Sequence, residues 1–126
     1  MNKAILGIGS NYPDAYIRVE ECCKRINDMV EFATFSSIYQ TEAVGLKPAP
    51  PYHNCVALIE TSISYDKLKA LFKDMEIKTG RNAKDKEQGL VIIDIDIVTW
   101  NNEVLRPADM ERSYMKIGLK ELGINS

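Results

Sequence analysis

Two aspartates, Asp94 and Asp96, stand within an aliphatic run that extends from Val91 to Val98. In a β-strand, residues two apart point to the same face and lie about 6.6 Å apart along the chain. Two carboxylates at that distance among apolar neighbours repel each other and are costly to bury. A divalent cation between them would offset this cost, and Mg²⁺ commonly binds one or two carboxylates together with substrate phosphates. The alternative is a solvated pair of charges on an open sheet face.

The segment directly before this run is rich in charged side chains. Arg81, Lys84 and Lys86 could meet the phosphates of a nucleotide held at the metal, because cationic side chains bind phosphate oxygens. Glu76, before this segment, could face solvent or help to hold these cations. A mixed-charge loop that is only solvated is the alternative.

A third group of polar residues precedes another apolar run. Asn54 carries both donors and an acceptor and can bind the amide-like edge of a heterocycle, on which the ring of Tyr52 can stack. His53 alternates with both and has no nucleophile motif around it, so we expect it on the strand surface. Gly7 and Gly9 lack the third glycine of a dinucleotide-binding fingerprint, and the chain has no P-loop motif.

The elements that must position these residues follow from apolar periodicity and turn residues. The predicted strands cover residues 4–9, 31–39, 52–61, 91–100 and 103–105, and the predicted helices follow Pro13, run from Ser64 to Gly80, and cover residues 109–122. Residues 40–51 and 81–89 are predicted loops. This order predicts an α+β, ferredoxin-like sandwich in which helices cover one face of an antiparallel sheet and the other face is open for a ligand.

The composition is that of one ordinary globular domain over residues 1–126. Apolar residues make up 45% and charged residues 27%, and the net charge of −2 argues against a general nucleic-acid or membrane binder. No apolar run approaches the length of a membrane span or a secretory signal. The three cysteines have no CxxC spacing, so we expect buried reduced thiols and a cytoplasmic protein. The oligomeric state does not follow from the sequence.

Five segments of the chain carry a recognisable pattern in a fixed order. They are residues 7–11 (Gly-Ile-Gly-Ser-Asn), 37–41 (Ser-Ile-Tyr-Gln-Thr), 52–54 (Tyr-His-Asn), Glu76 with 80–81 (Gly-Arg), and 93–97 (Ile-Asp-Ile-Asp-Ile). In this order they resemble the 6-hydroxymethyl-7,8-dihydropterin pyrophosphokinase family. The resemblance implies a ferredoxin-like fold and an ATP-dependent diphosphotransferase of folate biosynthesis. Such an enzyme transfers pyrophosphate from ATP to the hydroxymethyl group of the pterin with two Mg²⁺ ions.

Carried over by position, the resemblance also implies roles for individual residues. Asp94 and Asp96 would bind both metal ions. The implied pterin-binding residues are Thr41, Val44, Tyr52, Asn54 and Tyr114. The implied nucleotide-binding residues are Glu76 and Arg81. The expected catalytic cations are Arg81, Arg112 in place of a family arginine downstream, and Lys84 as a substitute for positive charge that the family has and this chain lacks. ATP and a pterin are the implied partners.

The chain departs from the family pattern next to the aspartates. Residues 87–91 (Glu-Gln-Gly-Leu-Val) stand where the family has an Arg-Trp-Gly-Pro-Arg-like run, and Ala83 replaces another arginine. Residues 107–110 (Pro-Ala-Asp-Met) lack the histidine of the family's Pro-His-Tyr-Asp-Met. Three interpretations stay open: a working pyrophosphokinase, a relative that binds pterin or nucleotide with weak or no transfer, and a structural domain without a ligand.

Overall fold

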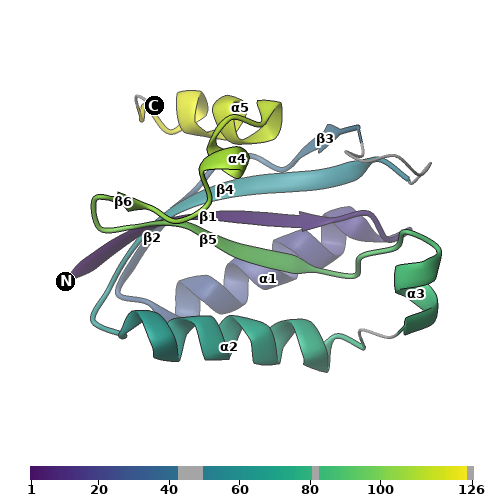
Figure 1. Cartoon of the computed structure of the whole chain (residues 1–126), viewed down its shortest axis with the longest axis horizontal. Helices are drawn as coiled ribbons and strands as arrows, with labels where there is room; N and C mark the ends of the chain where they lie inside the picture. The colour runs from purple at the N-terminus through teal and green to yellow at the C-terminus, as the bar shows by residue number, and fades with distance from the viewer. Residues whose placement is uncertain (43–49, 81–82, 125–126) are drawn as a thin grey trace.

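The computed structural model describes residues 1–42, 50–80 and 83–124, and shows one antiparallel sheet with helices on both faces (Figure 1). The strands are β1 (Asn2–Ser10), β2 (Phe32–Phe35), β3 (Tyr39–Thr41), β4 (Tyr52–Thr61), β5 (Asp94–Trp100) and β6 (Glu103–Val104). The helices are α1 (Ala15–Met29), α2 (Tyr65–Lys78), α3 (Ala83–Glu87), α4 (Pro107–Met110) and α5 (Ser113–Glu121).

The strand order is the one predicted for a ferredoxin-like sandwich. The sheet runs β2-β4-β1-β5-β6, with β3 paired to β4 beside β2. The central strand β1 pairs with β4 and β5, so Ile8 faces Cys55 on one side and Ile95 on the other. The crossings through α1 and α2 lie on one face, which confirms an α+β fold.

The main core lies between that face of the sheet and the two long helices. The helix predicted after Pro13 is α1, which buries one apolar stripe at Ala15, Val19, Cys22 and Ile26. Helix α2 begins as predicted at Ser64, whose side chain accepts a hydrogen bond from the backbone N–H of Lys67 at 3.4 Å. No helix among the described residues is long and apolar enough to cross a bilayer.

The predicted strand over residues 31–39 is in fact two strands, β2 and β3, separated at Ser36. The Ser36 hydroxyl accepts the backbone N–H of Val56 at 2.9 Å, while the Ser36 N–H donates to the Val56 carbonyl at 2.8 Å. A side-chain oxygen therefore replaces a backbone carbonyl in the pairing, and the regular ladder stops there. It resumes at Tyr39, which pairs with Asn54. Gln40 and Thr41, predicted as loop, belong to this second strand.

The prediction of a continuous loop over residues 81–89 is wrong, because α3 forms there. The predicted start of the next strand at Val91 is also wrong, since β5 begins at Asp94. Val91 is instead bonded to Asn11: its N–H donates to Asn11 Oδ1 at 2.6 Å, and its carbonyl accepts the Asn11 N–H at 3.1 Å. These bonds hold the chain at the end of β1, beyond the last ladder pair of Gly9 with Asp94.

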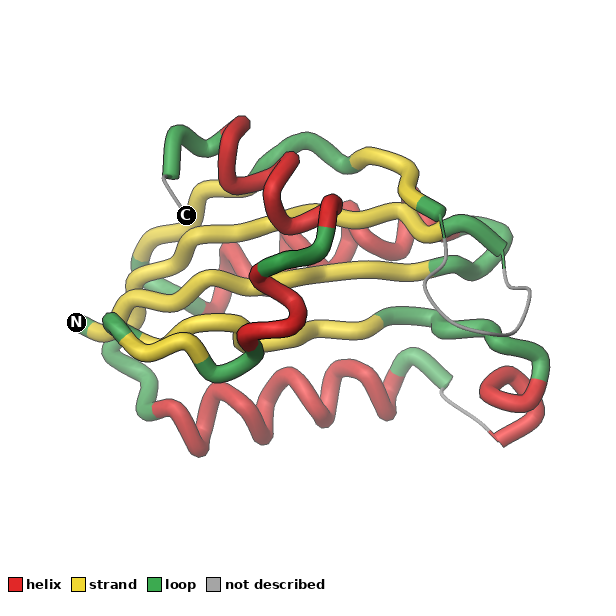
Figure 2. Tube along the Cα trace, turned by 45° about the horizontal axis from the view of Figure 1, so that its top comes forward, coloured by secondary structure: helices red, strands yellow, loops and turns green. Residues whose placement is uncertain are grey.

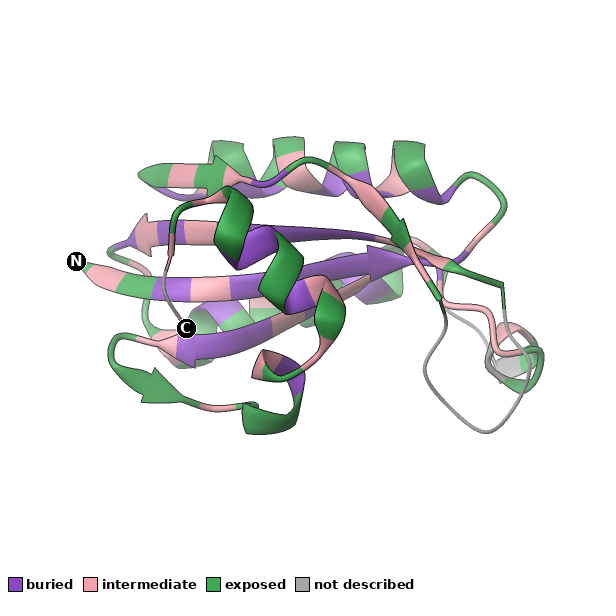
Figure 3. Cartoon of the chain, turned by 90° about the horizontal axis from the view of Figure 1, so that it is seen from above, coloured by how far each residue is buried: buried purple, intermediate pink, exposed green. Residues whose placement is uncertain are grey.

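The second face of the sheet is partly covered, contrary to the prediction of an open face. The helix predicted over residues 109–122 is two helices, α4 and α5, which lie across this face (Figure 2). Seen from above, the strands beneath them are largely buried (Figure 3). Gly118 of α5 packs directly on Val56, because a Cβ atom at Gly118 would lie 2.3 Å from Val56 Cγ2. A second, smaller core forms from Val56, Val98, Met115 and Leu119.

Candidate active site

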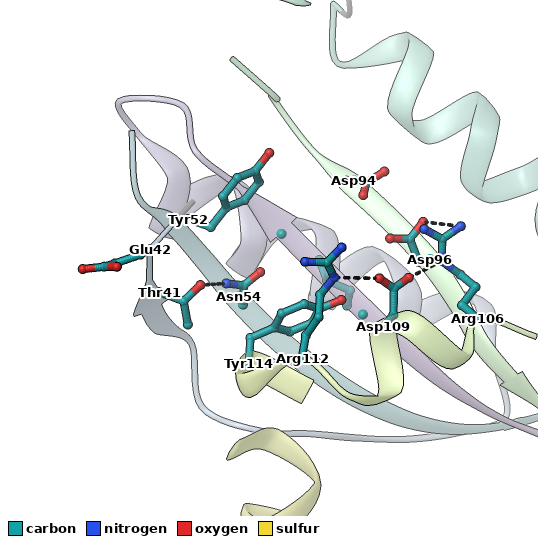
Figure 4. Close-up of a pocket in the computed structure, with 13 residues that line it drawn as sticks. Thr41, Glu42, Tyr52, Asn54, Asp94, Asp96, Arg106, Asp109, Arg112 and Tyr114 are labelled. Atoms are coloured by element: carbon teal, nitrogen blue, oxygen red, sulfur yellow. Dashed lines mark hydrogen bonds and ion pairs between the residues drawn. The ribbon is translucent and has the colours of Figure 1, made fainter. Parts of the chain in front are cut away.

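A cavity of about 240 Å³ lies where α4 and α5 leave the sheet uncovered (Figure 4). Its walls come from the ends of β1, β3, β4 and β5 and from the residues around α4 and α5. The lining residues are Gly7, Ile8, Gly9, Thr41, Glu42, Tyr52, Asn54, Asp94, Asp96, Arg106, Asp109, Arg112 and Tyr114. The cavity therefore brings together residues from four strands and both covering helices.

The two aspartates face this cavity, as the strand period predicts. Ile93, Ile95 and Ile97 point into the main core, which leaves Asp94 and Asp96 on the opposite side. Burial, and then the charge of Asp94, raise the pKa of the Asp96 carboxyl to about 7. A second negative charge is therefore unfavourable here, which favours a bound cation or proton.

A second cavity, of about 480 Å³, lies on the α2 side of the same aspartates. It is lined by Tyr65, Lys69, Phe72, Lys73, Glu76, Asp94, Ile95, Asp96, Ile97, Leu105 and Arg106. Asp94, Asp96 and Arg106 line both cavities and so form the wall between them. Besides the shared Arg106, the larger cavity offers two lysines and the ring of Tyr65 to a ligand, whereas the smaller one offers an amide, two tyrosines and Arg112.

Glu76 lies at the larger cavity and is almost fully buried, so it does not face bulk solvent. Its Oε2 accepts the backbone N–H of Ile95, the residue between the two aspartates, at 2.9 Å. The carboxylate thereby connects α2 to β5 at the aspartates. This contact gives Glu76 a structural role, and its predicted role at a nucleotide stays a prediction.

Most of the predicted pterin-binding residues meet in the smaller cavity. Asn54 is buried and donates through Nδ2 to Thr41 Oγ1, so the amide is fixed by the neighbouring strand β3. Tyr52 lies two residues before it on the same face of β4. Burial, and then the charge of Asp94, raise the pKa of the Tyr52 hydroxyl, which keeps it protonated. Val44 lies outside the described residues.

Tyr114 reaches the opposite side of the cavity from α5. A Cβ atom on Gly7 would lie 3.3 Å from the Tyr114 hydroxyl and 3.5 Å from its ring, so the absence of a side chain at Gly7 lets the ring lie over β1. The backbone carbonyl of Tyr114 accepts a hydrogen bond from the Tyr39 hydroxyl. Strand β3 thus supports both Asn54 and Tyr114.

Two of the three predicted catalytic cations are among the described residues, and these two lie in different places. Arg112 lines the smaller cavity, and its Nε donates to Asp109 Oδ1 at 3.1 Å. Lys84 is exposed on α3 and is not among the residues that line either cavity. Arg81 lies outside the described residues. The structure therefore brings only Arg112 to the aspartates among the described members of this group.

Sequence reasoning missed Arg106 and Asp109 at the smaller cavity, and Tyr65, Lys69 and Lys73 at the larger one. Arg106 Nη1 lies 3.8 Å from Asp96 Oδ1, and its Nε donates to Asp109 Oδ2. Asp109 is buried between the guanidinium groups of Arg106 and Arg112. Arg106 and Arg112 each lie three residues from Asp109, and side chains at this spacing meet on a helical turn. This spacing was the signal in the sequence that linked the three residues.

His53 lies on the opposite face of β4 from the cavity residues, in keeping with its alternation with Tyr52 and Asn54. Its ring meets the ring of Tyr16 of α1 edge-to-face, with centroids 6.4 Å apart. It is half-buried rather than fully exposed as a surface residue would be. Packing between β4 and α1 explains its position.

Comparisons of the sequence with known proteins identify a family. A sequence model of the family described as 7,8-dihydro-6-hydroxymethylpterin-pyrophosphokinase matches residues 5–123. The chain is 29% identical over 106 residues to the 2-amino-4-hydroxy-6-hydroxymethyldihydropteridine pyrophosphokinase of Aquifex aeolicus, covering 84% of this chain and 66% of that protein. Proteins of the same name from Haemophilus influenzae and Helicobacter pylori are 30% and 29% identical over 108 and 118 residues. Those alignments cover 84% and 91% of this chain, and 67% and 72% of the two relatives.

Proposed function

The chain belongs to the 7,8-dihydro-6-hydroxymethylpterin-pyrophosphokinase family, and we propose that it transfers pyrophosphate from ATP to the hydroxymethyl group of 6-hydroxymethyl-7,8-dihydropterin in folate biosynthesis. The observation that carries this proposal is the wall of Asp94, Asp96 and Arg106 between two cavities. A group is transferred efficiently only when both substrates are held together with their reacting atoms close and aligned, and two adjoining cavities allow this. Neither the family nor the names of its relatives support the alternative of an inactive protein.

The pterin occupies the smaller cavity in this proposal. Asn54 supplies donors and an acceptor to the amide-like edge of the ring, and Thr41 holds the Asn54 side chain in place. Tyr52 and Tyr114 supply aromatic faces for stacking on the heterocycle. Val44 belongs to the same set by its position in the sequence.

The nucleotide occupies the larger cavity. Tyr65 supplies aromatic surface for a base, while Lys69 and Lys73 supply positive charge for phosphates. Glu76 keeps β5 in place beneath it through the Ile95 N–H. Arg81, which follows α2 in the sequence, is a further cation for the nucleotide. Lys84 on α3 is another.

The two aspartates fit Mg²⁺, and two such ions are part of the proposal. No cluster of three or more histidine, cysteine or carboxylate side chains able to hold a metal occurs among the described residues. Mg²⁺ does not need one, because it binds one or two carboxylates and takes its other ligands from water and phosphates. Mg²⁺ bound here would neutralise negative charge on the phosphates of ATP.

The reaction joins the hydroxymethyl oxygen of the pterin to the β-phosphorus of ATP. The bond from this phosphorus to the oxygen that bridges it to the α-phosphorus breaks, AMP leaves with that oxygen, and the hydroxyl proton is released. The residues contribute mainly by positioning and charge, as is usual in phosphoryl transfer. Asn54 and Tyr114 orient the pterin, and the guanidinium groups of Arg106 and Arg112 lie beside the aspartates.

The test is release of AMP from ATP, measured with and without the hydroxymethyl pterin and with and without Mg²⁺. We expect release that requires both, and a loss of at least about a hundredfold in Asp94→Asn, since removal of one electrostatic contact to the transition state commonly costs that much. Asp28→Asn, on the exposed surface of α1, is the matched control and keeps the parent rate. AMP release that does not depend on the pterin would contradict the proposal.

A further inference from the structure

Arg106 is the one cation in the wall between the two cavities, among the residues that the structure describes. Arg112 lines only the smaller cavity, and Lys69 and Lys73 line only the larger one. A phosphate group that passes from one cavity to the other meets each of those three on one side only. The Arg106 side chain can contact it on both sides.

The guanidinium of Arg106 is held in place without being buried. Its side chain is 50% exposed, yet its Nε donates to Asp109, whose side chain is only 10% exposed. On the other side, its Nη1 lies 3.8 Å from Asp96 Oδ1. A guanidinium has five N–H donors in a rigid plane, so these two contacts leave donors for an anion.

Asp109 is itself fixed from several directions. Its second oxygen accepts Nε of Arg112 at 3.1 Å, and its backbone N–H donates to the Arg106 carbonyl at 3.1 Å in the turn of α4. One buried carboxylate therefore sets the positions of two guanidinium groups that face the cavity (Figure 4). A charge fixed before the reaction stabilises a transition state without the cost of reorganisation.

From this arrangement we propose that Arg106 is a catalytic residue that binds the pyrophosphoryl group as it passes between the cavities, and that Asp109 is its positioning residue. The inference rests on the proposed function and assigns it a cation outside the five motifs that carry the family resemblance. Because the group being transferred gains its closest contact to the wall during transfer, Arg106 acts more on kcat than on the KM for ATP.

The first test compares Arg106→Gln and Arg106→Lys with the parent protein in the AMP-release assay. We expect kcat to fall about 10²–10³-fold in Arg106→Gln, as for loss of one preorganised donor, with the KM for ATP changed less than about threefold. Arg106→Lys keeps the charge but loses the planar fork, so it recovers part of the rate. Lys116→Gln removes an exposed positive charge of α5 that pairs with Glu111, and it keeps the parent rate.

A second test measures binding rather than turnover, by calorimetry with the pterin and with its diphosphate product. Arg106→Gln should weaken binding of the diphosphate at least tenfold and leave binding of the pterin within twofold of the parent. Asp109→Asn should weaken the diphosphate in the same way. When it is combined with Arg106→Gln it should add less than it costs alone, because only its contact with Arg112 is then left to lose. A carboxylate with a purely structural role would instead weaken both ligands and add its effect to that of Arg106→Gln.

The outcomes separate this inference from the proposed function. A parent protein without pterin-dependent AMP release would overturn the proposed function and this inference with it. An active parent whose kcat and diphosphate affinity stay unchanged in Arg106→Gln and Arg106→Lys would overturn the inference alone. Thermal unfolding of each variant establishes that the compared proteins are folded.

Discussion

At the residue scale, the smaller cavity depends on two glycines without side chains as much as on the side chains that line it. Gly9 pairs with Asn54 across the β1–β4 ladder, and a Cβ atom on Gly9 would lie 2.8 Å from Asn54 Oδ1. Gly7, two residues earlier, leaves room for the ring of Tyr114 in the same way. Gly7 and Gly9 do not form a dinucleotide-binding fingerprint. They instead make space for an aromatic ring and an amide at one site.

The first prediction concerns Asn54. Asn54→Ala removes the donors and acceptor expected at the pterin and leaves ring groups unpaired, so pterin affinity should fall by roughly 1–3 kcal/mol. Calorimetric titration with the pterin measures this loss. Asn27→Ala on the exposed face of α1 is the control and binds as the parent does. Unchanged affinity in Asn54→Ala would show that the pterin does not bind in the smaller cavity.

The second prediction concerns the charge of Asp96 in the metal-free protein. Its pKa is raised to about 7 by burial and by Asp94, whereas an aspartate in the unfolded chain titrates near its ordinary value of about 3.9. Between these two values the folded protein holds a proton that the unfolded chain has released. Stability is therefore lost as the pH rises from about 4 to about 7, and changes little from this source above it.

Asp96→Asn should remove this loss, because the amide does not titrate. Urea unfolding in the presence of a chelator at pH 5 and pH 8 measures it. In the parent protein, the free energy of unfolding should fall between these pH values. In Asp96→Asn this fall should be smaller by roughly 1–2 kcal/mol. The exposed Asp28→Asn should follow the parent curve. A pH dependence that is identical in Asp96→Asn and the parent would contradict the raised pKa.

At the scale of elements, the positions of the site residues follow from packing that local sequence patterns describe only in part. The period of two in residues 93–97 was sufficient to predict that Asp94 and Asp96 share a face, because the alternate isoleucines had to enter the core. The break at Ser36 was not predictable in this way. It depends on a hydroxyl that pairs with Val56, twenty residues further along the chain.

The covering helices were the largest departure from expectation for the same reason. The sequence predicted a helix over residues 109–122, but not the face of the sheet on which it would lie. Gly118 decides this, because only a residue without a side chain lets α5 approach Val56 so closely. Arg106 and Asp109 reach the aspartates through the same docking, so their spacing of three residues could pair them with each other but could not place them at the site.

The third prediction tests this docking. Gly118→Ala places a methyl group against Val56 Cγ2 and the Tyr39 hydroxyl, so α5 has to move away from β4. We expect a loss of stability of about 1–3 kcal/mol from overpacking, despite the better helix propensity of alanine. Pterin affinity should fall as well, because α5 carries Tyr114. Chemical unfolding and calorimetry measure the two effects, with the exposed Lys120→Ala as control. A Gly118→Ala protein with parent-like stability would show that this contact does not position the helix.

At the scale of the whole molecule, the two cavities divide the sheet between two sets of covering elements. The smaller one lies against α4 and α5, and the larger one lies on the side of α2. The strand β5 and its two aspartates are common to both. In the proposed function, a ligand in either cavity changes the charge that the other one meets, so we expect the two sites to be coupled without any movement of the sheet.

This coupling gives the last prediction, which concerns thermal stability of the whole protein. Mg²⁺ alone should raise the melting temperature little, because it is reluctant to leave water for two carboxylates without further ligands. Mg²⁺ together with a non-hydrolysable ATP analogue should raise it by more than the sum of the two separate shifts, since each supplies ligands or charge to the other. Asp94→Asn should remove the excess while keeping the fold, and Asp66→Asn on the exposed first turn of α2 should retain it. A cation bound only by the carboxylates would stabilise the protein equally with and without the phosphates. If the melting-temperature shifts from Mg²⁺ and from the ATP analogue simply add in the parent protein, the aspartates do not join metal and nucleotide.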